Sequence, residues 1–272
     1  MNKLKPLPEE WSGLLNNEQK EAIENINGPL LIIAGAGSGK TRVLTYRYAH
    51  LIKTYGINFE NVLAITFTNK AANEMKDRIS DLLNLELSPK WISTFHSLCV
   101  KMLRIHGHLI GFNNNFTIYD QSDSTKLVRN CMRDSDIDTK QYSPKRIQAH
   151  ISSLKNQRIL PGEAVEFAQS FFDVKVAEIY SSYQKKLMLA NSMDFDDLLI
   201  KAVELLETSD KSLNYWSSKF QYIMIDEYQD TNMVQYRLVE LLASKHKNIC
   251  VVGDSDQSIY ACLLYTSDAA DD

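Results

Sequence analysis

Residues 30–41 read Leu-Leu-Ile-Ile-Ala-Gly-Ala-Gly-Ser-Gly-Lys-Thr, and this stretch decides the fold. Residues 30–34 form an apolar run bounded by glycines, which predicts a strand buried on both faces. Residues 34–41 form a Gly-rich loop, and residues 41–55 then repeat apolar side chains at helical spacing. A strand, a Gly-rich loop and a helix in this order predict a phosphate-binding P-loop rather than a turn that happens to end in Lys-Thr.

The residue types in this loop suit a nucleoside triphosphate. Glycines let the backbone curl and point its N–H groups at phosphate oxygens, and the following helix adds its positive N-terminal dipole. We expect Lys40 to reach the terminal phosphates and the Thr41 hydroxyl to ligate Mg²⁺. The predicted phosphate-binding residues are Ala34, which replaces the usual first glycine, Gly35, Ala36, Gly37, Ser38, Gly39, Lys40 and Thr41.

The same alternation continues along the chain. Further strands are predicted at 62–67, 221–225 and 248–252, with a short one at 91–93. Helices are predicted at 17–25, with Asn16 or Asn17 as cap, and at 70–83 and 96–104. Strands that alternate with helices predict an α/β fold with a parallel sheet covered by helices.

The middle of the chain has a different pattern. Residues 105–191 contain no convincing buried strand but several helical stretches, such as 164–172 and 174–189, which predicts a helical insertion. No acidic residue lies between Asp138 and Glu163, a segment with five basic residues. This basic run indicates either a solvated helix face or a phosphate-contacting surface. Its members are Lys140, Lys145, Arg146, Lys155 and Arg158.

Polar groups follow two of the predicted strands. Asp226 and Glu227 come directly after the strand at 221–225, and Gln257 lies shortly after the strand at 248–252. Open α/β sheets bind ligands at the carboxyl ends of their strands, so Asp226 is expected beside the P-loop. There Asp226 can hold Mg²⁺, Glu227 can take a proton from an attacking water, and Gln257 can sense the γ-phosphate.

The chain resembles the superfamily-one DNA helicases of the UvrD/Rep/PcrA type. The resemblance covers residues 15–260 and rests on segments that occur in the family's order. These segments are 15–19 (LNNEQ), 34–41, 65–72 (ITFTNKAA), 94–97 (TFHS), 194–198 (DFDDL), 226–232 (DEYQDTN) and 253–260 (GDSDQSIY).

The resemblance implies an ATP-dependent motor that moves along single-stranded DNA in the 3′-to-5′ direction and acts on forked DNA. Gln19 would read the adenine and Arg42 would also contact the nucleotide, while Lys40, Glu227 and Gln257 would be catalytic. The implied DNA-binding residues are Phe67, Asn69, Thr94, His96 and Tyr260. Base stacking on an aromatic ring suits tracking without sequence preference. Taken alone, Phe67 could equally be a core aromatic, and His96 a buried or capping histidine.

The resemblance also implies a domain plan. Residues 1–105 and 191–260 would form the first RecA-like P-loop NTPase domain, interrupted by a helical insertion subdomain at 106–190. The family pattern would continue after Tyr260 with a small residue and Trp-Arg, but residues 261–272 read ACLLYTSDAADD. We interpret this tail as non-native, and the second RecA-like domain of the family as absent. With half of the ATP site missing, we expect the chain alone to be a weak enzyme.

Bulk composition narrows the other possibilities. The net charge of −4 gives no overall basic signature, although a basic stripe can exist on such a protein. The four cysteines are too far apart for a zinc or redox motif, and no signal peptide or apolar run of about 20 residues is evident. These features predict a cytoplasmic protein that does not bind a membrane.

Two other functions remain open at this point. The chain could be the motor part of a helicase–nuclease, or a passive nucleotide-binding adaptor for DNA. Intact Lys40, Asp226, Glu227 and Gln257 argue against an adaptor that has lost catalysis. A small-molecule kinase also uses a P-loop, but the ordered DNA motifs and the helical insertion do not fit one.

Overall fold

The computed structural model describes residues 5–85 and 89–254. Their contacts divide them into two compact units, which we describe separately. The first unit holds the described residues of 5–98, 210–232 and 239–254, and the second holds 99–209 and 233–238. The sequence-predicted domain boundaries near 105 and 191 stay a prediction.

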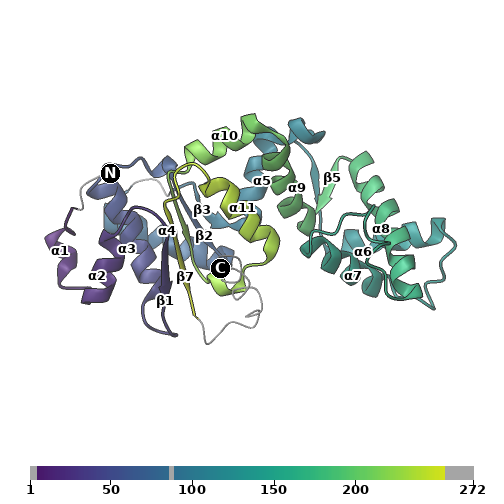
Figure 1. Cartoon of the computed structure of the whole chain (residues 1–272), viewed down its shortest axis with the longest axis horizontal. Coiled ribbons are helices and arrows are strands. Elements are labelled where there is room, and N and C mark those ends of the chain that lie inside the picture. The colour runs from purple at the N-terminus through teal and green to yellow at the C-terminus, as the bar shows by residue number, and fades with distance from the viewer. Residues whose placement is uncertain (1–4, 86–88, 255–272) are drawn as a thin grey trace, which may run out of the picture. The chain divides into compact units, whose positions relative to one another are not determined.

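The first unit is built on a parallel sheet of five strands among the described residues (Figure 1). The strand order is β1-β7-β6-β2-β3, and every neighbouring pair is parallel. The strands are β1 (Leu30–Ile33), β2 (Val62–Thr66), β3 (Ile92–Thr94), β6 (Tyr222–Ile225) and β7 (Ile249–Gly253). The predicted α/β fold with a parallel sheet is confirmed, and all five carboxyl ends lie at one edge of the sheet.

One face of this sheet is covered by helices α3 (Lys40–Lys53) and α4 (Asn69–Leu83). Apolar side chains of both helices pack on alternate residues of the strands, as the period-two alternation of a strand requires. The helices and 3-10 turns of this part are α1 (Glu9–Ser12), α2 (Asn17–Glu24), α3 (Lys40–Lys53), η1 (Phe59–Asn61), α4 (Asn69–Leu83), α10 (Asp210–Lys219) and η3 (Tyr228–Asp230). Two more helices, α5 (Phe95–His106) and α11 (Met233–Ala243), contribute residues to both units.

The first strand differs from the sequence prediction in its burial. Leu30 and Ile32 of β1 pack against the core, but Leu31 and Ile33 are 57% and 62% exposed. The expectation of a strand buried on both faces is therefore wrong for β1. Leu31 and Ile33 lie on the face of β1 opposite to this core, which the described residues leave uncovered, whereas β2 and β6 are fully buried.

The second unit is mainly helical, as predicted for the middle of the chain. Its elements are η2 (Gly107–Ile110), β4 (Thr117–Tyr119), α6 (Gln121–Asp134), α7 (Pro144–Asn156), α8 (Phe171–Leu189), β5 (Ser192–Asp194) and α9 (Phe195–Thr208). Sequence patterning missed β4, which pairs in parallel with β5 and is too short and too exposed to show an apolar run. The helix predicted at 164–172 is also wrong, because those residues form turns until Ser170 caps α8.

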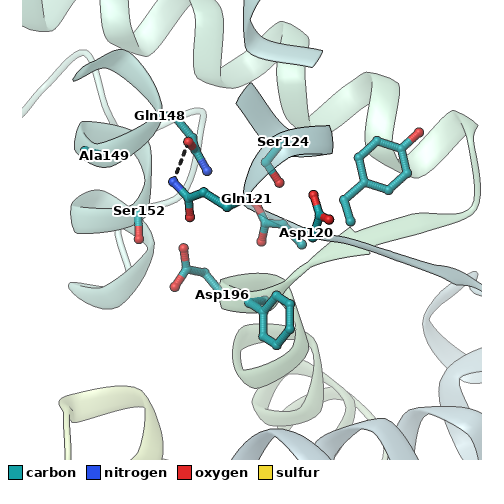
Figure 2. A pocket seen from close by; sticks show the side chains of 10 residues that line it. Asp120, Gln121, Ser124, Gln148, Ala149, Ser152 and Asp196 are labelled. Atoms are coloured by element: carbon teal, nitrogen blue, oxygen red, sulfur yellow. Dashed lines mark hydrogen bonds between the residues drawn. The ribbon is translucent and has the colours of Figure 1, made fainter. Parts of the chain in front are cut away.

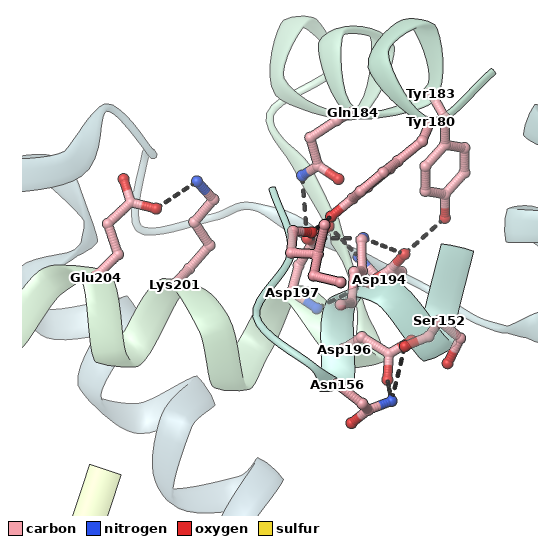
Figure 3. A network of polar contacts seen from close by, with 12 residues as sticks. Ser152, Asn156, Tyr180, Tyr183, Gln184, Asp194, Asp196, Asp197, Lys201 and Glu204 are labelled. Atoms are coloured by element: carbon pink, nitrogen blue, oxygen red, sulfur yellow. Dashed lines mark hydrogen bonds and ion pairs between the residues drawn. The ribbon is translucent and has the colours of Figure 1, made fainter. Parts of the chain in front are cut away.

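A buried ionic network lies where β5 meets α9 (Figure 3). Lys155 of α7 is fully buried and donates to Asp194 Oδ2 at 2.7 Å and to Asp197 Oδ1 at 2.8 Å. Tyr183 and Gln184 of α8 add hydrogen bonds to the same two carboxylates. The network therefore ties two helices to the β5–α9 junction.

This network corrects the interpretation of the basic run. Lys155 is neither on a solvated face nor free to contact phosphate, and Arg158 pairs with Glu207 at 2.8 Å. Arg146 lies over the ring of Phe172, 4.5 Å from its centroid. Lys140, Lys145, Arg146 and Arg158 are all exposed, so these four keep both of the original interpretations. The aspartates that bury Lys155 lie about 40 residues further along, which the local sequence could not reveal.

Candidate nucleotide-binding site

The Gly-rich loop connects β1 to α3 at the carboxyl edge of the sheet. Gly37 and Gly39 have φ values of +76° and +88°, a region that favours glycine because other residues place Cβ too close to the backbone. Gly39 is the N-cap of α3, so Lys40 and Thr41 occupy its first turn. The loop therefore has the strand–loop–helix setting that a phosphate site requires.

Lys40 is held at the ends of two strands. Its ammonium donates to the carbonyl oxygens of Ala34 at 2.8 Å and Gly35 at 3.2 Å. It also pairs with Asp254 Oδ2 at 3.1 Å, and both side chains of this pair are largely buried. The cation is thus already positioned inside the loop, at the point where β7 ends.

Asp226 follows β6 and lies directly beside the loop, as predicted. The Thr41 hydroxyl donates to Asp226 Oδ2 at 2.8 Å, and the Glu227 backbone N–H donates to Oδ1 at 3.1 Å. Burial raises the pKa of the Asp226 carboxyl, against the hydrogen bond from Thr41. A buried carboxylate with little compensating positive charge is an unfavourable group unless a cation neutralises it.

Thr41 and Asp226 place a hydroxyl and a carboxylate oxygen side by side, 2.8 Å apart and joined by a hydrogen bond. Hydroxyl and carboxylate oxygens are the hard ligands that Mg²⁺ prefers. Within 5–85 and 89–254, no group of three or more His, Cys, Asp or Glu side chains is placed to hold a metal by itself. Such an ion would therefore need further oxygens from phosphates or water.

Glu227 has an unusual backbone conformation. Its φ of 51° and ψ of 47° put it in the left-handed region, which costs a non-glycine residue about 1 kcal/mol or more. Its carboxylate oxygen Oε2 accepts a hydrogen bond from Gln229 Nε2 at 2.6 Å. The turn after β6 thus directs the Glu227 side chain onto the side chain of Gln229.

Gln19 contacts the phosphate loop, whereas Arg42 lies on the helix that follows it. Gln19 completes a capping box with Asn16 at the start of α2, and its Nε2 donates to the Ser38 carbonyl at 3.1 Å. Arg42 lies over the ring of Tyr46, 5.5 Å from its centroid. Both residues of that pair line a hollow of about 380 Å³, whose other lining residues are Thr45, Arg78, Asp81 and Leu82.

The predicted DNA-binding residues within the described ranges follow β2 and β3. Phe67 is 58% exposed directly after β2, so its interpretation as a core aromatic is wrong. Asn69 is exposed at the start of α4. Thr94 is buried and its hydroxyl bonds to Ser97, while His96 is half-buried in the first turn of α5. Gln257, Tyr260 and the tail at 261–272 lie outside the described residues.

Sequence reasoning missed two residues of this site. Asp254 pairs with Lys40, and Gln229 bonds both to Glu227 and to the Asp254 backbone N–H, at 3.0 Å. Asp254 ends a strand in the same way as Asp226, so its position was a usable signal. Gln229 gave no such signal, because its role depends on the turn that follows β6.

The second unit has a separate hollow of about 250 Å³ at the starts of α6 and α9. Figure 2 shows Asp120, Ser124, Ser152 and Asp196 around it, with Gln121 donating to Gln148 at 2.8 Å. None of the site residues predicted from the sequence lines this hollow. Across the described part of the chain, no helix combines the length and the apolar character needed to cross a membrane.

Comparison with known proteins gives a consistent result. The UvrD/REP helicase N-terminal domain matches residues 15–263. The ATP-dependent DNA helicase PcrA of Staphylococcus aureus strain Mu50 is 50% identical over 246 residues, which are 90% of this chain and 34% of that protein. The helicase of the same name from Staphylococcus epidermidis strain RP62A is 49% identical over the same shares. This chain thus spans about a third of the length of these relatives, and it belongs to the UvrD/REP helicase N-terminal domain family.

Proposed function

We propose that this chain binds and hydrolyses ATP with the residues gathered at the carboxyl edge of the first unit's sheet. The loop at 34–41 would hold the phosphates, and Lys40 would leave its carbonyl partners for the terminal phosphates. Gln19 and Arg42 would contact the nucleotide outside the phosphate chain. The closeness of Lys40, Thr41 and Asp226 supports this proposal most directly.

In the proposed reaction a water oxygen bonds to the γ-phosphorus while the bond from that phosphorus to ADP breaks. Glu227 would accept the proton that the water loses. Thr41 and Asp226 would hold Mg²⁺, which supplies positive charge against the phosphate oxygens. Gln257 is proposed to sense the γ-phosphate.

We further propose that hydrolysis drives 3′-to-5′ movement on single-stranded DNA, as the N-terminal motor half of a helicase that acts on forked DNA in the cytoplasm. Phe67 supports this role because its ring is exposed next to the strand ends that carry the nucleotide residues. Asn69, Thr94, His96 and Tyr260 are proposed as further DNA contacts. The name of these relatives, ATP-dependent DNA helicase, agrees with the proposal.

The test is ATP hydrolysis with and without single-stranded DNA, measured for this chain and for a longer protein that contains it. We expect DNA to stimulate the longer protein strongly and the 272-residue chain weakly. An arginine supplied to the ATP site by a facing domain contributes on the order of 10³–10⁵ in rate in related enzymes. Glu227→Gln should keep ATP binding and reduce hydrolysis to a trace rate. Hydrolysis that continues undiminished after this change would remove Glu227 as the base.

A further inference from the structure

We propose that Gln229 is a positioning residue that fixes the Glu227 carboxylate to the end of β7 and, through Asp254, to Lys40. This inference rests on the proposed function, because it concerns the residue assigned there as the base. Its basis is a chain of short contacts in the first unit. Gln229 Nε2 donates to Glu227 Oε2 at 2.6 Å, and Gln229 Oε1 accepts from the Asp254 backbone N–H at 3.0 Å.

The orientation of the Gln229 amide is determined by its partners. A backbone N–H can only donate, so the amide oxygen must face Asp254. The amide nitrogen then faces Glu227, whose ionised carboxylate can only accept. Gln229 is therefore the one uncharged side chain of this length that satisfies both neighbours at once. A glutamate would set a second carboxylate against Glu227, and a methionine would satisfy neither partner.

Gly253, at the end of β7, leaves space for the Gln229 amide. A Cβ atom at position 253 would lie 3.1 Å from Gln229 Oε1 and 3.6 Å from the Gln229 backbone nitrogen. The first distance is tighter than ordinary van der Waals contact, so a side chain there would push the amide away. Gly253 does not have a positive φ, which leaves close approach as the reason for glycine at this position.

The hydrogen bond from Gln229 also bears on the strained backbone conformation of Glu227. A glutamate in the left-handed region holds that conformation only when its surroundings compensate for the strain. The charge-assisted hydrogen bond from buried Gln229 supplies such compensation and fixes the direction of the carboxylate. Glu227 Oε1 is then the oxygen that receives the proton from water.

The same chain of contacts reaches the phosphate loop. Asp254, whose N–H binds Gln229, accepts the Lys40 ammonium on its carboxylate at 3.1 Å. When Lys40 moves to a terminal phosphate, Asp254 loses this partner, and the strand end that holds Gln229 changes its contacts. Gln229 thereby links occupancy of the phosphate loop to the placement of the base.

The experiment measures kcat and KM for ATP in the DNA-stimulated longer protein that contains this chain. Gln229→Met keeps the side-chain volume and removes both hydrogen bonds. Because a misplacement of about 1 Å can lower a rate on the order of a hundredfold, we expect kcat to fall about tenfold to a hundredfold. The KM for ATP should change less than about twofold, because the side-chain hydrogen bonds of Gln229 go to Glu227 and Asp254 and not to the loop at 34–41. An unchanged kcat, or a loss carried by KM, would overturn the inference.

A double-mutant cycle separates positioning from a general structural role. If Gln229 acts through Glu227, Gln229→Met should add no further loss to the residual rate of Glu227→Gln. A further fall of the same size in that background would contradict the proposal. Should Gln229→Met fail to fold, Gly253→Ala perturbs the same contact, and it is expected to lower kcat more than it changes KM.

The matched control is Gln184→Met. Gln184 likewise donates its amide N–H to a buried carboxylate, that of Asp197 at 3.0 Å, but it belongs to the second unit. Its loss should leave kcat unchanged, so an equal fall in both variants would contradict a specific role for Gln229. If the unaltered protein neither binds nor hydrolyses ATP, the proposed function itself fails and the inference fails with it. Normal hydrolysis that is insensitive to Gln229→Met overturns only the inference.

Discussion

Replacing Lys155 with methionine removes the only positive charge that the described contacts place between Asp194 and Asp197. The Lys155 side chain is 0% exposed, and its ammonium lies 2.7 Å and 2.8 Å from the two carboxylates. Methionine keeps most of the aliphatic stem, so the packing change is small. The variant therefore isolates the electrostatic role of this buried cation (Figure 3).

The expected loss of stability is large. Removing one partner of a buried ion pair costs about 3–5 kcal/mol, because the other partner stays buried without compensation. Here two carboxylates lose a shared partner, so we expect the upper part of that range. For a unit of this size the loss corresponds to a fall in melting temperature of about 10 °C or more.

Lys201→Met is the matched control. Lys201 pairs with Glu204 one turn along the same helix, α9, but this pair is partly exposed and should contribute less than about 1 kcal/mol. Urea unfolding followed by far-UV circular dichroism would give both values. Equal and small losses in the two variants would refute the claim that Lys155 holds the α7–α9 region together.

The loss should also depend on pH in a definite direction. Burial raises the pKa of Asp197 to about 6 even with Lys155 beside it. Without the lysine that pKa rises further, because the charge that favours ionisation is gone. A carboxyl whose folded pKa is raised contributes stability below its unfolded pKa and loses it as pH rises through the folded pKa. Lys155→Met should therefore be less destabilising at pH 5 than at pH 8, and a larger loss at pH 5 would contradict this reasoning.

Three further predictions concern the first unit. Asp226→Asn should raise the melting temperature of the nucleotide-free chain at pH 7, because burial raises the pKa of this carboxyl and opposes its ionised form. Mg²⁺-dependent ATP binding should weaken at the same time. A lower melting temperature would count against the argument. Gly39→Ala should cost about 1–2 kcal/mol in urea unfolding because φ is +88°; it should also weaken ATP binding, since the new Cβ would lie 3.0 Å from Gln19 Nε2. Phe67→Ala should leave the melting temperature within about 1 °C but weaken single-stranded DNA binding by about 1–3 kcal/mol in fluorescence anisotropy. A large fall in melting temperature would instead show that Phe67 packs in the core.

Much of the first unit could be predicted because its signals are local. The apolar runs at 62–66 and 222–225 became buried strands, and Asn16 caps α2 as expected. The placement of Asp226 beside Thr41 followed from the rule that parallel strands share a carboxyl edge. In each case neighbouring residues carry the information, so spacing alone was sufficient.

The failures have a common physical cause. Burial of Lys155 depends on two aspartates about 40 residues away, and exposure of Leu31 and Ile33 depends on which face of β1 the rest of the described chain covers. Gln229 reaches both Glu227 and the Asp254 backbone N–H from the turn after β6, where Glu227 is in the left-handed region. Such features arise from long-range contacts, which a pattern within a short window of sequence does not contain.

Titration of Mg·ATP into the folded chain tests the central claim most directly. A fluorescent ATP analogue should give saturable binding that weakens when Mg²⁺ is chelated and is lost in Lys40→Ala, with folding of the variant verified by circular dichroism. This outcome follows from the placement of Lys40, Thr41 and Asp226 around one loop. The absence of saturable binding to the folded chain, or equal binding by Lys40→Ala, would contradict the account.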